Sequence, residues 1–233
     1  GDEGGFAPDL KSNEEALEVI IEAVEKANYK PGDDVMIALD PAASSFYDKE
    51  KGKYILAGEG NRELTSEELV DFYADLVGKY PIISIEDPVG EDDPEGMREF
   101  TRRFGERVQI IGDDYLVTNA KLVKEAVEFG ACNSVLVKVN QVGTVSEALD
   151  TFITAEKAGW QGVVSARSGE TEDVSISHLA VGLGSGQLKV GSFNRSERMA
   201  KWNECLRIQD ALGAETFVGG APLVNTWWGR KYL

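Results

Sequence analysis

Short apolar runs alternate with amphipathic stretches along most of the chain. Buried strands of parallel sheets read as near-continuous apolar runs, whereas surface helices place apolar residues three and four positions apart. The runs predict strands over residues 35–40, 82–86, 108–112, 134–139, 161–165 and 187–191. The amphipathic stretches predict helices over residues 13–28, 65–79, 93–104, 119–129, 144–158, 172–185 and 195–212. This alternation predicts an α/β fold with parallel strands and right-handed crossovers.

Six strands are visible, whereas a closed (β/α) barrel has eight. We therefore expect two strands to be missing on the amino-terminal side, unless the sheet is open. The connection formed by residues 41–64 is too long for a plain crossover. Its length predicts a lid or a small hairpin, with KYILAG as one strand of the hairpin. Asn13 is expected to cap the first helix, and Thr65 to Glu68 form a good capping sequence for the second. The paired Trp227 and Trp228 of the Gly-rich tail suggest a packing or subunit contact.

Charged residues close several of the apolar runs. Asp40 ends VMIALD, Glu86 lies in IISIED, and Asp113 lies in VQIIGDD, while Lys138 and Lys189 lie in SVLVKV and QLKVG. In a (β/α) barrel the carboxyl ends of the strands form the catalytic face. The pattern therefore predicts one pocket that holds either a divalent metal with a proton-moving lysine or a salt-bridge network at the strand ends.

The composition and net charge of the chain limit the classes of partner that it can bind. The 233 residues suit one domain, and the formal net charge of −17 disfavours nucleic acid and anionic membranes as partners. We found neither a membrane-spanning apolar run nor a signal peptide, and Cys132 and Cys205 make no disulfide framework, so we expect a cytoplasmic protein. His178 is interpreted as a packed helix residue. The chain opens without Met, which suggests a fragment or a processed product.

Seven sequence blocks resemble one family throughout the chain and in order. They are GDEGGFAP, LDPAASSFY, SIEDP, GDDYLVTN, LVKVNQVGT, SARSGETED and NRSERMAKWN, and they resemble the barrel domain of enolase (phosphopyruvate hydratase). The resemblance implies an enolase-type (β/α) barrel domain over residues 1–233, truncated at its amino terminus, with the first barrel strands and a capping domain absent. It also implies Mg²⁺-dependent dehydration of 2-phosphoglycerate to phosphoenolpyruvate in glycolysis, with Mn²⁺ as a substitute ion.

The resemblance assigns roles to individual residues. It implies that Asp40, Glu86 and Asp113 bind the metal, and that Lys138 is the general base. Glu3 is implied to be the acid that helps the hydroxyl leave. The implied substrate-binding residues are Lys189, Arg167, Ser168, Glu86 and Asp113. Asp114, Asn140 and Gln141 are expected behind these groups, and Ser44 and Ser45 on a loop that approaches them.

Two positions depart from the family pattern: Ala166 stands where a histidine is usual, and Val190 where a threonine is usual. Two alternatives therefore stay open, namely a relative that acts on another acid and a non-catalytic scaffold with the same fold. The expected partners are a small phosphorylated acid and either the missing amino-terminal segment or a second chain. The resemblance also implies a homo-oligomer, a dimer or an octamer, in the complete protein.

Overall fold

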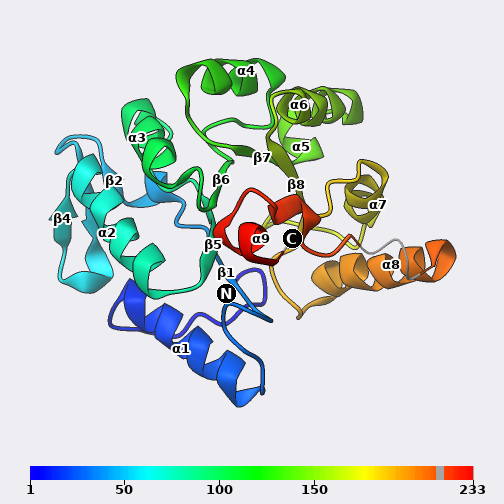
Figure 1. Ribbon diagram of the computed structural model, residues 1–233, viewed down its shortest axis with the longest axis horizontal. Helices are drawn as coiled ribbons and strands as arrows, with labels where there is room; N and C mark the ends of the chain where they lie inside the picture. The colour runs from blue at the N-terminus through cyan, green and yellow to red at the C-terminus, as the bar shows by residue number, and fades with distance from the viewer. Residues whose placement is uncertain (214–217, 233) are drawn as a thin grey trace.

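The computed structural model describes residues 1–213 and 218–232. Its main feature is a curled parallel sheet of six strands in the order β1-β5-β6-β7-β8-β9, with helices around its outer face (Figure 1). The strands are β1 (Ile37–Leu39), β5 (Ile82–Glu86), β6 (Gln109–Gly112), β7 (Ser134–Val137), β8 (Gln161–Ser165) and β9 (Leu188–Lys189). The predicted α/β fold and its six parallel strands are confirmed.

Helices precede, connect and follow the strands along the chain. They are α1 (Asn13–Lys26), α2 (Ser66–Lys79), α3 (Pro94–Phe104), α4 (Ala120–Phe129), α5 (Val139–Val142), α6 (Val145–Lys157), α7 (Ser175–Gly182), α8 (Ser196–Leu212) and α9 (Trp227–Tyr232). Neighbouring strands pair in parallel, for example Val135 with Gly162 and Val164 with Leu188. Because every strand of this sheet runs the same way, the carboxyl ends of all six lie at one end of it.

The helix caps agree with the prediction for α2 but not for α1. Thr65 and Glu68 form the predicted capping box, with each side chain accepting a hydrogen bond from the other residue's backbone N–H. At α1 the cap is Ser12, whose hydroxyl accepts from the N–H of Glu15 at 3.1 Å. Asn13 is the first helical residue instead, and its side-chain amide donates to Glu59 at 2.8 Å. The prediction of Asn13 as the cap was therefore wrong by one residue.

Residues 41–64 form a small antiparallel sheet, which confirms the predicted hairpin strand. Its strands are β2 (Tyr47–Asp48), β3 (Lys53–Leu56) and β4 (Arg62–Leu64), flanked by short 3₁₀ turns at Ala43–Phe46 and Ala57–Glu59. The buried Tyr54 hydroxyl donates to Asp93 Oδ2 and accepts from the N–H of Gly90, both at 2.9 Å. The Ser44 hydroxyl accepts a further bond from the N–H of Glu91 at 3.0 Å. Hydrogen bonds thus connect the 41–64 segment to the loop after β5.

Replacing Tyr54 by phenylalanine is expected to destabilise the protein. The change leaves the Gly90 N–H without its acceptor and removes a donor to Asp93, and an unsatisfied buried polar group costs about 1–3 kcal/mol. Urea denaturation followed by circular dichroism measures the free energy of unfolding. The control is Tyr29→Phe, on an exposed side chain. A Tyr54→Phe variant as stable as this control would contradict the assigned role of the hydroxyl.

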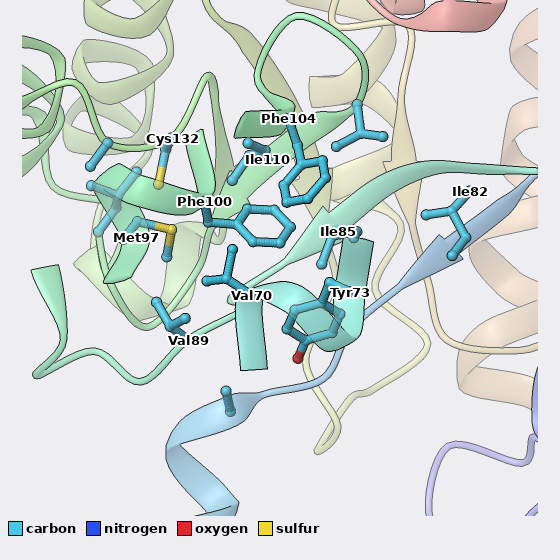
Figure 2. Close-up of a cluster of buried hydrophobic side chains, with 14 of the residues drawn as sticks. Val70, Tyr73, Ile82, Ile85, Val89, Met97, Phe100, Phe104, Ile110 and Cys132 are labelled. Carbon is cyan, nitrogen blue, oxygen red and sulfur yellow. The ribbon is translucent and has the colours of Figure 1, made fainter. Parts of the chain in front are cut away.

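The main hydrophobic core lies between the sheet and the outer helices. Figure 2 shows part of it, where residues of α2 and α3 meet those of β5 and β6. The ring of Tyr73 meets the ring of Phe100 edge-on, with centroids 5.5 Å apart, and Phe100 lies 4.8 Å from Phe104. Met97 and Phe100 are fully buried. This packing holds the strands rigidly and so fixes where their carboxyl ends lie.

Several element boundaries differ from the prediction. Strand β7 ends at Val137, so Lys138 is the cap of the short helix α5 and not a strand residue. Helix α7 spans Ser175–Gly182 and is shorter than predicted. His178, expected to be packed, is exposed on α7, and its Nε2 lies 3.0 Å from Glu204 of α8. His178 therefore contacts a carboxylate at the protein surface and does not pack in the core.

The tail contains helix α9, which the sequence reading did not predict. The Trp227 indole donates to the carbonyl of Ile82 at 2.8 Å, and its backbone N–H donates to the carbonyl of Arg107 at 2.8 Å. Both acceptors lie at the amino ends of strands. Helix α9 therefore covers the end of the sheet opposite the charged residues, in the middle of the view in Figure 1, and the packing interpretation of Trp227 is confirmed. Among the described residues, the helices are too short or too polar to cross a membrane.

Candidate functional site

The five predicted charged residues gather at the carboxyl end of the sheet. Glu86 and Lys189 are the last residues of β5 and β9, whereas Asp40, Asp113 and Lys138 directly follow β1, β6 and β7. The common direction of the strands brings the five residues to the same end of the sheet. There they form two ion-paired groups, one around Lys189 and one around Lys138.

Lys189 bridges two carboxylates. Its ammonium lies 2.6 Å from Asp40 Oδ2 and 2.7 Å from Glu86 Oε2. These carboxylates belong to the neighbouring strands β1 and β5, whereas Lys189 is on β9 at the other end of the strand order. The Glu86 side chain is only 4% exposed, and burial raises its pKa to about 8 although Lys189 opposes the shift. Burial alone would lower the pKa of Lys189, but the charges of Glu86 and Asp40 outweigh it and raise that pKa. Burial therefore disfavours the charged form of Glu86, and a cation beside it favours that form.

Lys138 pairs with Asp113 in the second group. Its ammonium donates to Asp113 Oδ2, and both side chains are largely buried. The backbone N–H of Lys138 donates to the Thr118 hydroxyl at 3.0 Å, and that hydroxyl donates in turn to Gln141 at 2.7 Å. Gln141 also donates to Asp113 Oδ1 at 3.4 Å, as expected for a residue behind the site. The lysine is thus held at both its backbone and its ammonium.

Asp87 is a site residue that the sequence reading missed. Its carboxylate accepts the backbone N–H groups of Asp113 at 3.0 Å and Asp114 at 2.7 Å, and its backbone takes the left-handed conformation with φ 40°. Burial raises its pKa to about 7. Oxygens of Asp87, Asp113 and Asp114 lie within 4.8 Å of one another, close enough to hold a metal ion together. The available signal was the second acid of the run IISIED.

A cavity of about 490 Å³ opens above these groups. Its lining includes Glu3, Asp40, Asp113, Lys138, Arg167 and Lys189. Glu86 is not part of the lining but accepts a hydrogen bond from Lys189, which is. The wall also contains Ala166 and Val190, the two departures from the family pattern, and both are buried. Acidic and basic groups therefore share one solvent-filled space.

Glu3 reaches the cavity from the amino-terminal segment. Its Oε1 accepts from the Ser168 hydroxyl at 2.6 Å, and its backbone carbonyl accepts from the Ser192 hydroxyl at 2.5 Å. A Cβ at Gly191 would lie 2.2 Å from Glu3 Oε2, and the φ of Gly191 is +113°. Only glycine fits at this position, because any side chain would displace the carboxylate.

Arg167 lies on the loop after β8. Its guanidinium donates to Asn140 Oδ1 at 3.3 Å, and its backbone N–H donates to Glu170 Oε1 at 2.9 Å. Ser168 follows directly, so a guanidinium and a hydroxyl stand side by side at the cavity. Buried Arg198 also lines this wall and was not predicted, although it lies within the quoted block NRSERMAKWN.

The donors present suit a hard divalent cation. The carboxylates of the cavity and its floor offer oxygen atoms only, which favour Mg²⁺ or Mn²⁺ over zinc. Burial raises the pKa of Glu86, and a cation bound beside it would favour its charged form. An acidic cluster able to hold a metal is therefore present, and its oxygen donors fit the expected ion. Of the three predicted ligands it includes only Asp113, whereas Asp40 and Glu86 pair with Lys189.

Comparison with protein-family models matches residues 1–226 to the family described as "Enolase, C-terminal TIM barrel domain". The chain belongs to this family. The curled six-stranded sheet is accordingly that of an enolase-type barrel, and the resemblance of the seven blocks is confirmed. Membership supports a lyase-type, metal-dependent enzyme of the enolase superfamily. It names no substrate, and the role of each site residue stays a prediction.

Proposed function

We propose that this enolase-family chain carries the dehydration of 2-phosphoglycerate to phosphoenolpyruvate, and the reverse reaction. The observation that carries the proposal is one cavity lined by a lysine and a glutamate from distant parts of the chain, Lys138 and Glu3. Dehydration of this kind needs a base for the proton on one carbon and an acid for the hydroxyl on the next.

Lys138 is assigned the base. The Lys138 ammonium, which donates to Asp113, first releases a proton. The resulting amine takes the proton next to the substrate carboxylate, and the electrons of that C–H bond become available to form the carbon–carbon double bond. The contacts of Lys138 with Asp113 and Thr118 fix its position before the reaction. Proton transfer by a positioned side chain contributes about 10²–10⁴-fold to the rate.

Glu3 is assigned the acid that completes the reaction. Its carboxyl gives a proton to the leaving hydroxyl, which departs as water when the C–O bond breaks and the double bond forms. The contact with Ser168 and the close approach of Gly191 hold the Glu3 carboxyl in place. Glu3 and Lys138 thus act on neighbouring carbons of one bound substrate.

Asp40, Glu86 and Asp113 are assigned to hold Mg²⁺, with Asp114 beside them. Mg²⁺ bound by these residues would offset the negative charge that develops on the substrate carboxylate. The Lys189 ammonium, which spans Asp40 and Glu86, adds positive charge at the same place. Arg167 and Ser168 are assigned to the phosphate, because a guanidinium matches phosphate oxygens with two parallel donors.

The direct test is a phosphoenolpyruvate-formation assay on the purified full-length protein with 2-phosphoglycerate and Mg²⁺, followed by ultraviolet absorbance. We expect turnover that chelation abolishes and Mg²⁺ restores. Absence of turnover from correctly folded, Mg²⁺-loaded protein would refute the assignment of this substrate.

A relative acting on a different acid is the second candidate, and the wall beside Arg167 favours it. Ala166 and Val190 place apolar groups there in a cavity lined mostly by charged and polar residues. A substrate with an apolar substituent would fit such a wall. This candidate shares proton abstraction by Lys138 and differs only in what the pocket recognises.

Ala166→His distinguishes the two candidates. If the substrate is 2-phosphoglycerate, an added imidazole donor next to Arg167 should raise kcat/KM about 10- to 100-fold, since a hydrogen bond to a charged group contributes about 1.5–3 kcal/mol. Steady-state kinetics of phosphoenolpyruvate formation measure the change. A fall in kcat/KM would instead favour a pocket fitted to another acid. Ala27→His, at the exposed carboxyl end of α1, is the control for a general effect of histidine.

A further inference from the structure

Helix α8 turns two cations toward the protein interior. Arg198 and Lys201 lie one turn apart on this helix, and both side chains are fully buried. Burial of a charge is costly unless hydrogen bonds and opposite charges compensate it. The partners of these two side chains therefore indicate what the helix is for.

Arg198 binds backbone carbonyls on two sides of the cavity. Its Nη1 donates to the carbonyls of Arg167 at 2.8 Å and Val190 at 3.0 Å, and its Nη2 donates to the carbonyl of Ser168 at 2.6 Å. One planar group thus joins the loop after β8 to the strand end at β9. A guanidinium can do this because its donors point in fixed, diverging directions.

Lys201 holds the same loop one turn further along. Its ammonium donates to Glu170 Oε2 at 2.8 Å and to the carbonyl of Thr171. The other oxygen of Glu170 accepts the backbone N–H of Arg167 at 2.9 Å. The segment 167–171 is therefore fixed from below by a continuous set of buried hydrogen bonds that begins on α8.

The charges of the two residues are balanced differently. Lys201 is neutralised by Glu170, which is 13% exposed, whereas the short contacts of Arg198 are with neutral carbonyls. The Glu197 carboxylate lies 3.8 Å from Arg198 Nε and is itself paired with Arg195 at 2.8 Å. Positive charge consequently persists in the cavity wall beneath Arg167, where it favours an anion.

We propose that Arg198 and Lys201 are positioning residues that hold the 167–171 segment in the shape that binds the phosphate group of the substrate. Arg167 and Ser168 make the contacts with the anion, and the two α8 cations set the backbone from which they extend. This inference rests on the proposed function, because it takes Arg167 and Ser168 as the phosphate ligands. It adds that recognition of phosphate depends on a helix whose buried side chains do not take part in the proton transfers.

Arg198→Lys is the first test, made in the full-length protein. The substitution keeps the charge, but an ammonium cannot reach three diverging carbonyls at once. We expect the affinity for inorganic phosphate, measured calorimetrically, to fall about 10- to 100-fold, the scale of loss when a binding group is misplaced by about 1 Å. KM for 2-phosphoglycerate should rise in parallel, while kcat changes much less. Arg102→Lys, on an exposed side chain of α3, is the matched control.

Hydrogen exchange separates positioning from general stability. In Arg198→Lys the amides of residues 167–171 should exchange faster while those of β5 and β6 keep the parental rate. A purely structural role would lower the melting temperature and leave the phosphate affinity of the folded protein unchanged. If Arg198→Lys does not fold, Glu170→Gln decides. It keeps an acceptor for the Arg167 N–H and weakens the bond to Lys201, so a smaller loss of phosphate affinity is expected.

If Arg198→Lys and Glu170→Gln bind phosphate normally, the variant Arg167→Met shows whether the role of α8 or the proposed function is wrong. Loss of phosphate binding in Arg167→Met together with parental binding in folded Arg198→Lys and Glu170→Gln would overturn the role of α8 and leave the proposed function intact. Parental phosphate binding in Arg167→Met would overturn the phosphate site itself, and with it both proposals.

Discussion

Replacing Lys138 by alanine is expected to abolish exchange of the α-proton of 2-phosphoglycerate with solvent deuterium. The lysine lines the cavity and is held in place by Asp113 and by Thr118. Loss of a general base lowers a rate by about 10²–10⁴-fold. Nuclear magnetic resonance follows the exchange directly and does not require the complete reaction. Substrate affinity should change much less, because the assigned phosphate ligands lie on the loop after β8.

Lys121→Ala is the control for this experiment, since Lys121 is an exposed lysine of α4 whose partner is also on the surface. Exchange at the parental rate in Lys138→Ala would exclude this residue as the base. The acidic groups around it would then be an ion-pair network, which is the alternative that the sequence left open.

Glu86→Gln should weaken Mg²⁺ binding by at least about 100-fold. Substitutions behind the direct ligands already cost about 10–100-fold in metal affinity, and this one removes both a ligand oxygen and a formal charge. Isothermal titration of the full-length protein with Mg²⁺ measures the effect. Metal-free protein should not be destabilised, because burial already favours the neutral form of Glu86, as its pKa of about 8 indicates.

Glu67→Gln provides the control, at an exposed position in the first turn of α2. Unchanged Mg²⁺ affinity in Glu86→Gln would mean that this carboxylate serves only as the partner of Lys189. Loss of affinity accompanied by general unfolding would be recognised from the circular dichroism spectrum and would leave Asp113→Asn as the deciding variant, since Asp113 touches the cavity itself.

The sequence predicted the site as far as strand polarity determines it. Asp40, Glu86 and Asp113 each follow or end an apolar run, and a parallel sheet must bring such positions to one end. The same reasoning placed Lys189 correctly, since it ends β9. These successes need only the direction of each strand and the position of a charge along it.

Other parts of the site depend on contacts that no local pattern specifies. Asp87 follows Glu86 directly, but its role comes from backbone N–H groups 26 and 27 residues away. Arg198 and Lys201 occupy the buried face of a helix, where sequence rules expect apolar residues. Ser12 and Asn13 are both good caps, and tertiary contact with Glu59 decides between them. The sequence therefore indicated which charged residues lie at the carboxyl end of the sheet. It did not indicate which hydrogen bonds and buried residues position them.

The separation along the chain of the residues that meet at the cavity has a consequence for how activity arises. Lys189 and Asp40 are 149 residues apart, and Ser168 and Glu3 are 165 residues apart, whereas Lys138 and Asp113 are only 25 apart. Contacts that close long loops cost more chain entropy and slow folding. A partly folded chain can therefore build the lysine–aspartate pair locally and still be chemically inert. Catalytic activity requires the last strands of the sheet to be in place, because only then do the distant residues meet. Recovery of activity during refolding should therefore lag behind recovery of helix content.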